Sequence, residues 1–231
     1  MPTRRALLVV SLCAMLVAGL AGPTRAQIAL DRLIVELPGR AGATADVEVR
    51  NGGDAAAYIV VEPAEVIAPG TADERRHEAA DPETLGLLAA PSRLVLAPGA
   101  RRIVRLARLD DPGSRERVWR VRIRPVTGAT TSETSALKVL VGYGVLVLGR
   151  PPQPRAAIRA ERRGDALVLV NEGNAGALLF GGRHCDADGA RCVELAPRRL
   201  YPGNRWRVPL RWDTPVVVNV ESPSGVRERR F

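Results

Sequence analysis

One stretch of the sequence, residues 136–148, is apolar on both faces of the strand that it would form. Successive side chains of a strand point to opposite faces, and a half-buried strand needs only one apolar face. Here every odd position is Leu, Val or Tyr, most even positions are Leu or Gly, and Lys138 is the only charge. A second apolar face at a sheet edge invites pairing with another chain. Residues 136–148 are therefore either the central strand of a sandwich or a strand kept for a partner.

The first 26 residues are typical of a secretory signal. Arg4 and Arg5 precede an apolar stretch, and a small-x-small cleavage site ends at Ala26. The apolar stretch is shorter than a membrane-spanning helix requires. We expect cleavage after Ala26 and export of residues 27–231 across the inner membrane to the periplasm, with no integral membrane segment left. The alternative is a retained membrane anchor.

The basic side chains do not indicate a nucleic-acid partner. The formal charge is +9, and loss of the three arginines of the signal leaves about +6 on the exported chain. These basic residues are scattered through the predicted strands, and the chain has only eight aromatic side chains (Phe, Tyr and Trp). Nucleic-acid binding usually needs a basic face with stacking aromatics. We therefore expect no nucleic acid among the partners.

Short predicted strands separated by Gly/Pro turns fill the exported chain, with little helical periodicity. The predicted strands are residues 30–37, 45–50, 58–61, 94–100, 102–109, 118–123, 136–148, 157–160, 166–171, 177–182, 192–195, 206–210 and 216–220, with a long polar loop over 68–92. A spacing of about 8–12 residues is typical of an all-β sandwich. The proline-rich segment 150–154 is stiff, as suits a hinge. We predict two β-sandwich domains, residues 27–149 and 150–231.

No constellation of residues in the sequence indicates an enzyme. His184 and Cys185 could form a dyad, but neighbouring residues of a strand point to opposite faces, and Cys192 is at hand to oxidise the thiol. Asp186 and Asp188 resemble part of a calcium loop, yet no third acid and no bidentate Glu follow at the needed spacing. We therefore expect no catalytic residues, no metal site and no cofactor.

Two cysteines remain after removal of the signal, Cys185 and Cys192. In an oxidising compartment such a close pair is expected to form a disulfide. The residues between them include Asp-Ala-Asp-Gly, a sequence typical of a hairpin turn. We predict a structural disulfide that joins the two sides of this hairpin.

Several stretches together resemble the periplasmic chaperones of the chaperone–usher pilus pathway, the PapD-like family. Residues 96–106 (LAPGARRIVRL) are similar to a strand–turn–strand stretch of that family, and residues 29–32 (ALDR) are similar to its first mature strand. Residues 171–174 (NEGN), 213–215 (DTP) and 150–151 (RP) also match in order. The resemblance covers nearly all of the exported chain.

The resemblance implies two immunoglobulin-like sandwiches arranged as an L or boomerang. It also implies that the last strand of the first domain lends apolar side chains to a pilus or fimbrial subunit, which then passes to an outer-membrane usher. With Arg150 as the register mark, the lent side chains are Leu137, Val139, Val141 and Tyr143. The rival hypothesis is an exported adhesion or carbohydrate-binding β-sandwich protein, which would need an exposed aromatic platform.

Two charged sites near the domain junction are also implied by the resemblance. One is an ionic cluster, for which the matching residues are Glu116, Arg105 and Arg150; its fourth member would be an acid, and Glu221 is close to the matching position, which is Ser222.

The other charged site grips the C-terminal carboxylate of the subunit with an Arg and a Lys. The matching positions here are Ile34 and Leu146, so the chain departs from the family pattern. This departure suggests the archaic, Csu-like branch, which serves spore-coat-type subunits. We expect the anchor to be rebuilt from Arg32 with Arg120 or Arg122.

Overall fold

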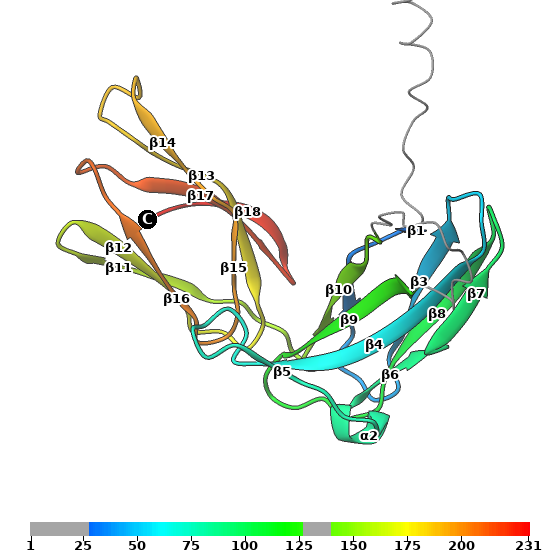
Figure 1. Cartoon of the computed structure of the whole chain (residues 1–231). Helices are drawn as coiled ribbons and strands as arrows, with labels where there is room; N and C mark the ends of the chain where they lie inside the picture. The colour runs from blue at the N-terminus through cyan, green and yellow to red at the C-terminus, as the bar shows by residue number, and fades with distance from the viewer. Residues whose placement is uncertain (1–27, 127–139) are drawn as a thin grey trace, which may run out of the picture.

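The computed structural model describes residues 28–126 and 140–231, and these residues are almost entirely β-structure. They form two groups of sheets, one built from β1–β10 and one from β11–β18, and no strand pairing joins the two groups. Each group encloses its own apolar core. Figure 1 shows the two sandwiches meeting at one end and enclosing an angle, as the two arms of an L do. The predicted all-β, two-sandwich fold is confirmed.

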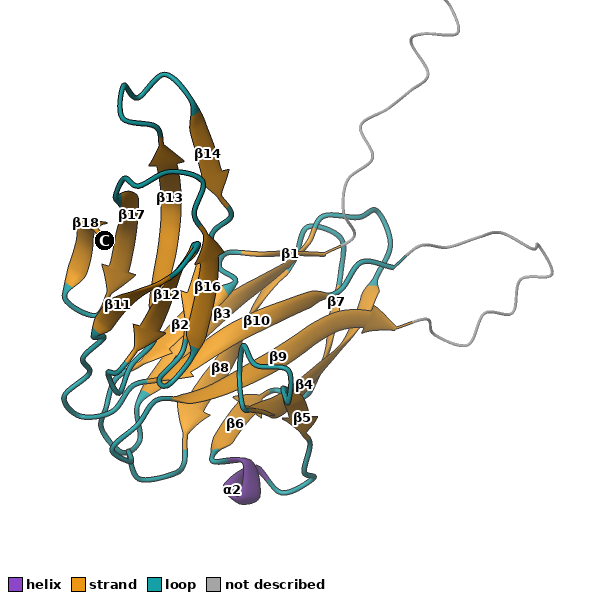
Figure 2. Cartoon of the chain, turned by 90° about the vertical axis from the view of Figure 1, so that its left-hand side faces the viewer, coloured by secondary structure: helices purple, strands orange, loops and turns teal. Residues whose placement is uncertain are grey.

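The first sandwich consists of two sheets packed face to face (Figure 2). One sheet contains, in order, β1 (Ile28–Leu30), β3 (Thr44–Asn51), β8 (Arg101–Arg108) and β6 (Leu87–Ala90). The other contains β2 (Ile34–Leu37), β10 (Tyr143–Gly149), β9 (Arg117–Val126), β4 (Ala57–Ile67) and β5 (Arg75–His77), with β7 (Arg93–Leu96) also paired to β4. The short helix α2 (Pro82–Leu85) precedes β6. The segment 68–92, predicted as mostly loop, thus contributes β5, α2 and β6.

The second sandwich has one sheet of three strands and one of five. The smaller sheet contains β11 (Ile158–Arg163), β12 (Ala166–Asn171) and β16 (Arg205–Pro209). The larger contains β14 (Cys192–Leu195), β13 (Ala177–Cys185), β17 (Val216–Ser222) and β18 (Gly225–Arg230), with β15 (Arg198–Leu200) also paired to β13. Alternate residues of β17, namely Val216, Val218 and Val220, face the core, as the period of two in a strand requires.

The strand predicted over residues 136–148 is shorter in the structure, because β10 begins at Tyr143. Residues 140–142 are described but lie outside the strand, and residues 136–139 are outside the described part of the chain. Gly142 adds no side chain for packing, and a Cβ at this position would lie 2.7 Å from the Cβ of Arg124. The chain therefore runs close beside β9 before regular pairing starts.

The connection between the two sandwiches runs from Gly149, where β10 ends, to Ile158, where β11 begins. A Cβ on Gly39 would overlap the backbone of Pro151, so only glycine lets this turn of the first sandwich approach the hinge so closely. No helix within 28–126 and 140–231 is long and apolar enough to cross a membrane. The predicted signal, residues 1–26, lies outside the described residues.

Candidate functional site

The two faces of β10 are covered by different parts of the molecule. Val145 and Val147 point into the core of the first sandwich. Leu146 and Leu148 lie on the opposite face, where they form a small apolar cluster that includes Tyr201 of the second sandwich. Both faces of this end of β10 are therefore buried, one by its own domain and one at the domain junction.

The edge of β10 that faces β2 is occupied for only part of its length. The parallel pairing of β2 with β10 begins where Ile34 lies opposite Leu146, and the backbone N–H of Leu146 donates to the carbonyl of Leu33 over 2.8 Å. Residues Tyr143–Val145 pair with β9 on their other side, but no strand of the described chain pairs with them on this side. Unpaired backbone groups at a sheet edge are a template for an added strand.

The four predicted donor side chains have different fates. Leu137 and Val139 lie outside the described residues. Val141 projects into solvent with 51% of its surface exposed. Tyr143 is half-buried against the core of the first sandwich, and its hydroxyl donates to the carbonyl of Ile28 over 3.0 Å. Val141 is thus accessible to a partner, whereas Tyr143 would have to leave its place beside Ile28 to enter one.

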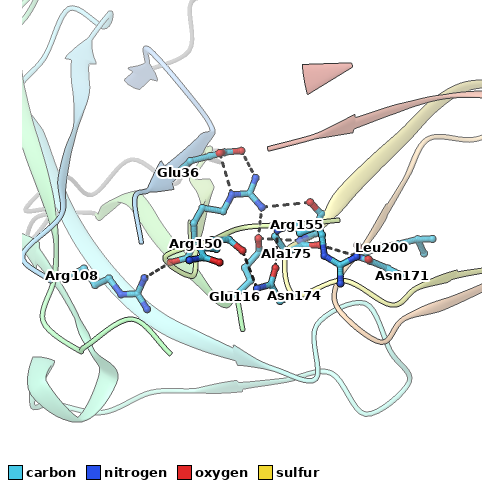
Figure 3. A network of polar contacts seen from close by, with 11 residues as sticks. Glu36, Arg108, Glu116, Arg150, Arg155, Asn171, Asn174, Ala175 and Leu200 are labelled. Carbon is cyan, nitrogen blue, oxygen red and sulfur yellow. Dashed lines mark hydrogen bonds and ion pairs between the residues drawn. The ribbon is translucent and has the colours of Figure 1, made fainter. Parts of the chain in front are cut away.

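Arg150 is the centre of the ionic cluster at the domain junction (Figure 3). Its side chain is buried, and its guanidinium contacts both Glu36 on β2, at 3.1 Å from Nε, and Glu116 in the loop before β9. Glu116 in turn accepts a hydrogen bond of 3.1 Å from the backbone N–H of Gly176 in the second sandwich. The cluster therefore ties the hinge residue to both domains.

The electrostatics of this cluster follow from its burial. Burial raises the pKa of the Glu116 carboxyl, although Arg150 and the N–H of Gly176 favour its charged form. For Arg150, burial opposes the charged form, but the hydrogen bond to Glu36 and the charge of Glu116 prevail and raise its pKa. Arg150 is therefore a permanent buried charge that depends on its two carboxylates.

One predicted member of the cluster is elsewhere, which corrects the prediction. Arg105 lies on β8, in the other sheet, where it forms a two-point ion pair with Asp46 at 2.8 and 2.9 Å, and 62% of its side chain is exposed. Glu36 occupies the third place in its stead. Glu221, considered as the fourth member, is exposed on β17, where it lies opposite Leu178 and Val226.

The hinge is fixed from the other side by Asn171 and Asn174, which belong to the stretch that matched the family (Figure 3). The side-chain amide of Asn171 donates to the carbonyls of Ala175 and Leu200 over 2.8 and 2.9 Å. The side-chain oxygen of Asn174 accepts from the backbone N–H of Arg155 over 2.7 Å. These bonds satisfy backbone groups that would otherwise be left unpaired where the chain enters the second sandwich.

The three arginines predicted for the carboxylate anchor differ in how they are engaged. Arg32 pairs with its neighbour Asp31 at 2.7 Å, and Arg122 lies 3.4 Å from Glu62. Arg120 has no acidic partner within the described residues and donates to the carbonyl of Gly144 over 3.3 Å. Arg120 also lies directly opposite Leu146, the position that the family pattern gives to the lysine of the anchor.

A fourth arginine, not predicted from the sequence, lies near the same place. Arg199 on β15 is half-buried and has no ion pair among the residues that the structure describes. Burial raises the pKa of the Tyr201 hydroxyl, while the positive charges of Arg199 and Arg120 both oppose this rise. Tyr201 is therefore approached by one unpaired arginine from each sandwich. Only the pairing of β15 with β13 brings Arg199 there, and the sequence gives no local signal for it.

The second sandwich contains the predicted disulfide. Cys185 and Cys192 lie opposite each other on β13 and β14 and are bonded, so no free thiol is available for a Cys–His dyad. His184 is buried beside Trp212, with its Nδ1 accepting from the backbone N–H of Arg211 over 3.4 Å. No cluster of three metal-ligating side chains occurs within the described ranges.

Comparisons with known proteins bear on the fold. No family model matches the chain. A CS1 fimbrial subunit of Escherichia coli is 27% identical over 173 residues, which cover 70% of each chain. The crystal structure of the class 5 fimbriae chaperone CfaA has a TM-score of 0.66 at 21% identity and covers 88% of this chain and 98% of its own.

A second solved structure contains the CsuC chaperone with the CsuE subunit, from the archaic Csu pili of Acinetobacter baumannii. It has a TM-score of 0.56 at 12% identity and covers 80% of this chain and 91% of its own. The assignment to the archaic branch stays a prediction, but the resemblance to pilus chaperones is confirmed as a likeness of the whole fold. The chain has the fold of the fimbrial and pilus chaperones.

Proposed function

We propose that this protein is a periplasmic chaperone of pilus or fimbrial subunits, and not an enzyme. It captures a newly exported subunit through the free edge of β10, which is added to the sheet of the subunit together with the residues that lead into it. It then passes the subunit to an outer-membrane usher. The observation that carries the proposal is the strand edge at Tyr143–Val145, which has no neighbour on the β2 side in the described chain, next to the exposed Val141.

The energetics of such an edge favour a subunit with an open apolar groove. Backbone pairing along the edge supplies the hydrogen bonds, and alternate side chains supply apolar contact. Full burial of one large aliphatic side chain contributes about 1.5–3 kcal/mol. Several such side chains would offset the ordering of a short segment and still leave net affinity.

The anchor for the subunit's C-terminal carboxylate is proposed at Arg120, with Arg199 as its partner from the second sandwich. Arg32 and Arg122 already contact carboxylates of this chain, at 2.7 and 3.4 Å, whereas Arg120 and Arg199 have no acidic partner in the described residues. A guanidinium can hold a carboxylate by two parallel hydrogen bonds. The apolar neighbour Leu146 would reduce competition from water at this place.

The rival hypothesis of a carbohydrate-binding sandwich loses its support at the aromatic side chains. Trp119 is fully buried, and its indole N–H donates to the carbonyl of Leu85 over 2.8 Å. Trp206 and Trp212 are each half-buried in the second sandwich. Stacking on a sugar ring needs an exposed aromatic face, which the described tryptophans do not offer.

Val141→Arg tests the proposal, and Val95→Arg is a matched control. Both valines are exposed on the first sandwich, at 51% and 59%, but Val95 lies on β7, away from the free edge of β10. An unpaired charge in an apolar groove costs several kcal/mol, so Val141→Arg should abolish co-purification of a subunit from the periplasm, and Val95→Arg should not. Normal recovery with folded Val141→Arg protein would refute the proposal.

A further inference from the structure

The positive charge of the exported chain is confined to its second half. Residues 28–126 contain 15 arginines and 15 acidic residues, whereas residues 150–231 contain 15 arginines and nine acidic residues. The first sandwich is therefore neutral, and the second is a basic body. A net charge of this kind raises the local concentration of acidic partners.

Three of the arginines of the second sandwich lie together on its edge strand. β18 ends the larger sheet and pairs only with β17. All six of its residues are exposed, and Arg227, Arg229 and Arg230 have no ion pair among the described residues. The cation of Arg229 lies 4.9 Å from the ring of Phe231, which holds the end of the strand without neutralising the charge.

The backbone of β18 also has unused hydrogen-bonding groups. Phe231 and Val216 exchange both of their hydrogen bonds, at 2.9 and 3.0 Å. In an antiparallel pair such residues alternate with residues whose N–H and C=O point away from the partner strand. The N–H and C=O groups of Val226, Glu228 and Arg230 therefore point outward, to the side where no described strand lies.

The side chains of β18 are sorted by the same alternation. Arg227 and Arg229 lie opposite Val220 and Val218, so they share the face that turns toward the core, yet both are exposed. A strand added beside β18 would place every second side chain next to these two arginines. Acidic side chains at alternate positions would then meet two unpaired guanidinium groups.

From these observations we infer that the free edge of β18 binds an extended acidic segment of a partner protein as an additional strand. Edge charges also protect a sheet from pairing with another copy of itself. Protection alone requires charge of either sign, whereas here the unpaired edge charge is basic within a basic domain. The inferred contact is separate from β10 and does not depend on the proposed chaperone function.

Binding of a fluorescein-labelled peptide, Gly-Glu-Thr-Glu-Thr-Glu-Gly, to the mature protein tests this inference by fluorescence anisotropy at low salt. The double variant Arg227→Glu with Arg229→Glu should weaken binding by about tenfold or more. The matched control is Arg40→Glu with Arg50→Glu, which changes the net charge equally at two exposed positions of the first sandwich and should bind normally. Equal weakening by both double variants would show attraction to net charge only and would overturn the inference.

Glu228→Pro separates strand addition from simple attraction. Proline removes an N–H that points away from β17, so the fold should tolerate it, but an added strand loses a hydrogen bond. Binding should fall with Glu228→Pro and persist with Glu228→Ala. Equal binding by these two variants overturns strand addition, as does binding to phosphatidylglycerol vesicles without binding to the peptide. If the double Glu variant fails to fold, Arg227→Gln with Arg229→Gln replaces it; dimers of that variant, without peptide binding by the parent protein, would identify protection alone and overturn the inference.

Discussion

The two ends of β10 have the same apolar character but opposite surroundings. From Leu146 to Gly149 the strand lies between β2 and β9, and its outer face is covered at the domain junction by Tyr201. At Tyr143–Val145 the strand has β9 alone as its described neighbour, and Val141 just before it is exposed. The difference shows that one segment can be a core strand at one end and an available edge at the other.

Arg150→Ala should have the largest effect, because it attacks the end at which β10 is held. The change leaves the buried carboxyl of Glu116 without its guanidinium partner. Removal of one member of a buried pair costs about 3–5 kcal/mol, which urea unfolding of the mature protein would measure. Arg105→Ala is the control, because its pair with Asp46 is exposed and should contribute little. Similar losses in the two variants would mean that the junction cluster does not hold the strand.

Truncation of one side chain at each end gives the most direct form of the comparison. Leu148 is fully buried, so Leu148→Ala should lower the free energy of unfolding by about 2–5 kcal/mol. Val141→Ala removes exposed atoms and should change it by about 0.5 kcal/mol or less. Equal losses in thermal or urea unfolding would show that the two ends are buried alike.

Tyr143→Phe examines the boundary between the two ends. The variant loses the hydrogen bond from the hydroxyl to the carbonyl of Ile28, so the free protein should be less stable by about 0.5–1.5 kcal/mol. If Tyr143 leaves Ile28 in the complex with a subunit, recovery of the subunit should be unchanged or improved. Reduced recovery from a stable variant would instead place the hydroxyl in the bound interface.

Asp110→Asn should give the smallest effect, seen only in the acid range. Burial opposes ionisation of Asp110, but hydrogen bonds from Arg108 and Arg117 outweigh it and hold its pKa below the ordinary value of 3.8. Its contribution to stability is therefore complete above pH 3.8 and is lost as the pH falls through the lower pKa of the folded protein. Arg108 also donates to the carbonyl of Arg150 over 2.7 Å, so this acid effect reaches the held end of β10.

The comparison of acid unfolding curves decides the last point. The variant should be less stable than the parent protein at neutral pH, and the two curves should approach each other as the pH falls. Curves that stay parallel down to the lowest pH would show that Asp110 does not contribute through its charge.

The sequence predicted features that depend on local chemistry. The two-residue period of the apolar positions, the Gly/Pro turns and the spacing of Cys185 and Cys192 lead to the sandwiches and the disulfide without knowledge of any distant contact. The cleft-facing leucines Leu146 and Leu148 were apparent as a second apolar face, but the sequence could not identify Tyr201 as their cover, since Tyr201 is more than fifty residues away along the chain.

Charged partners were the part that the sequence could not assign. Arg105 and Glu36 both lie in strands of the first domain, but only the register of the sheets shows that Arg105 faces Asp46 and that Glu36 reaches Arg150. Arg199 was missed for the same reason, because its position depends on β15 pairing with β13. Long side chains meet partners that are distant in sequence, and no local periodicity records which ones.

The fastening of β10 at its Arg150 end has a mechanical consequence. A load along the strand, applied at the free end, acts in shear on the hydrogen bonds to β2 and β9 together, and the ionic cluster and the Arg108 contact prevent the far end from slipping. A load across the strand opens its bonds one after another from Tyr143. The first domain should therefore resist lengthwise pulling and yield to peeling, so that a strand laid against this edge can be removed stepwise while β10 itself stays in place.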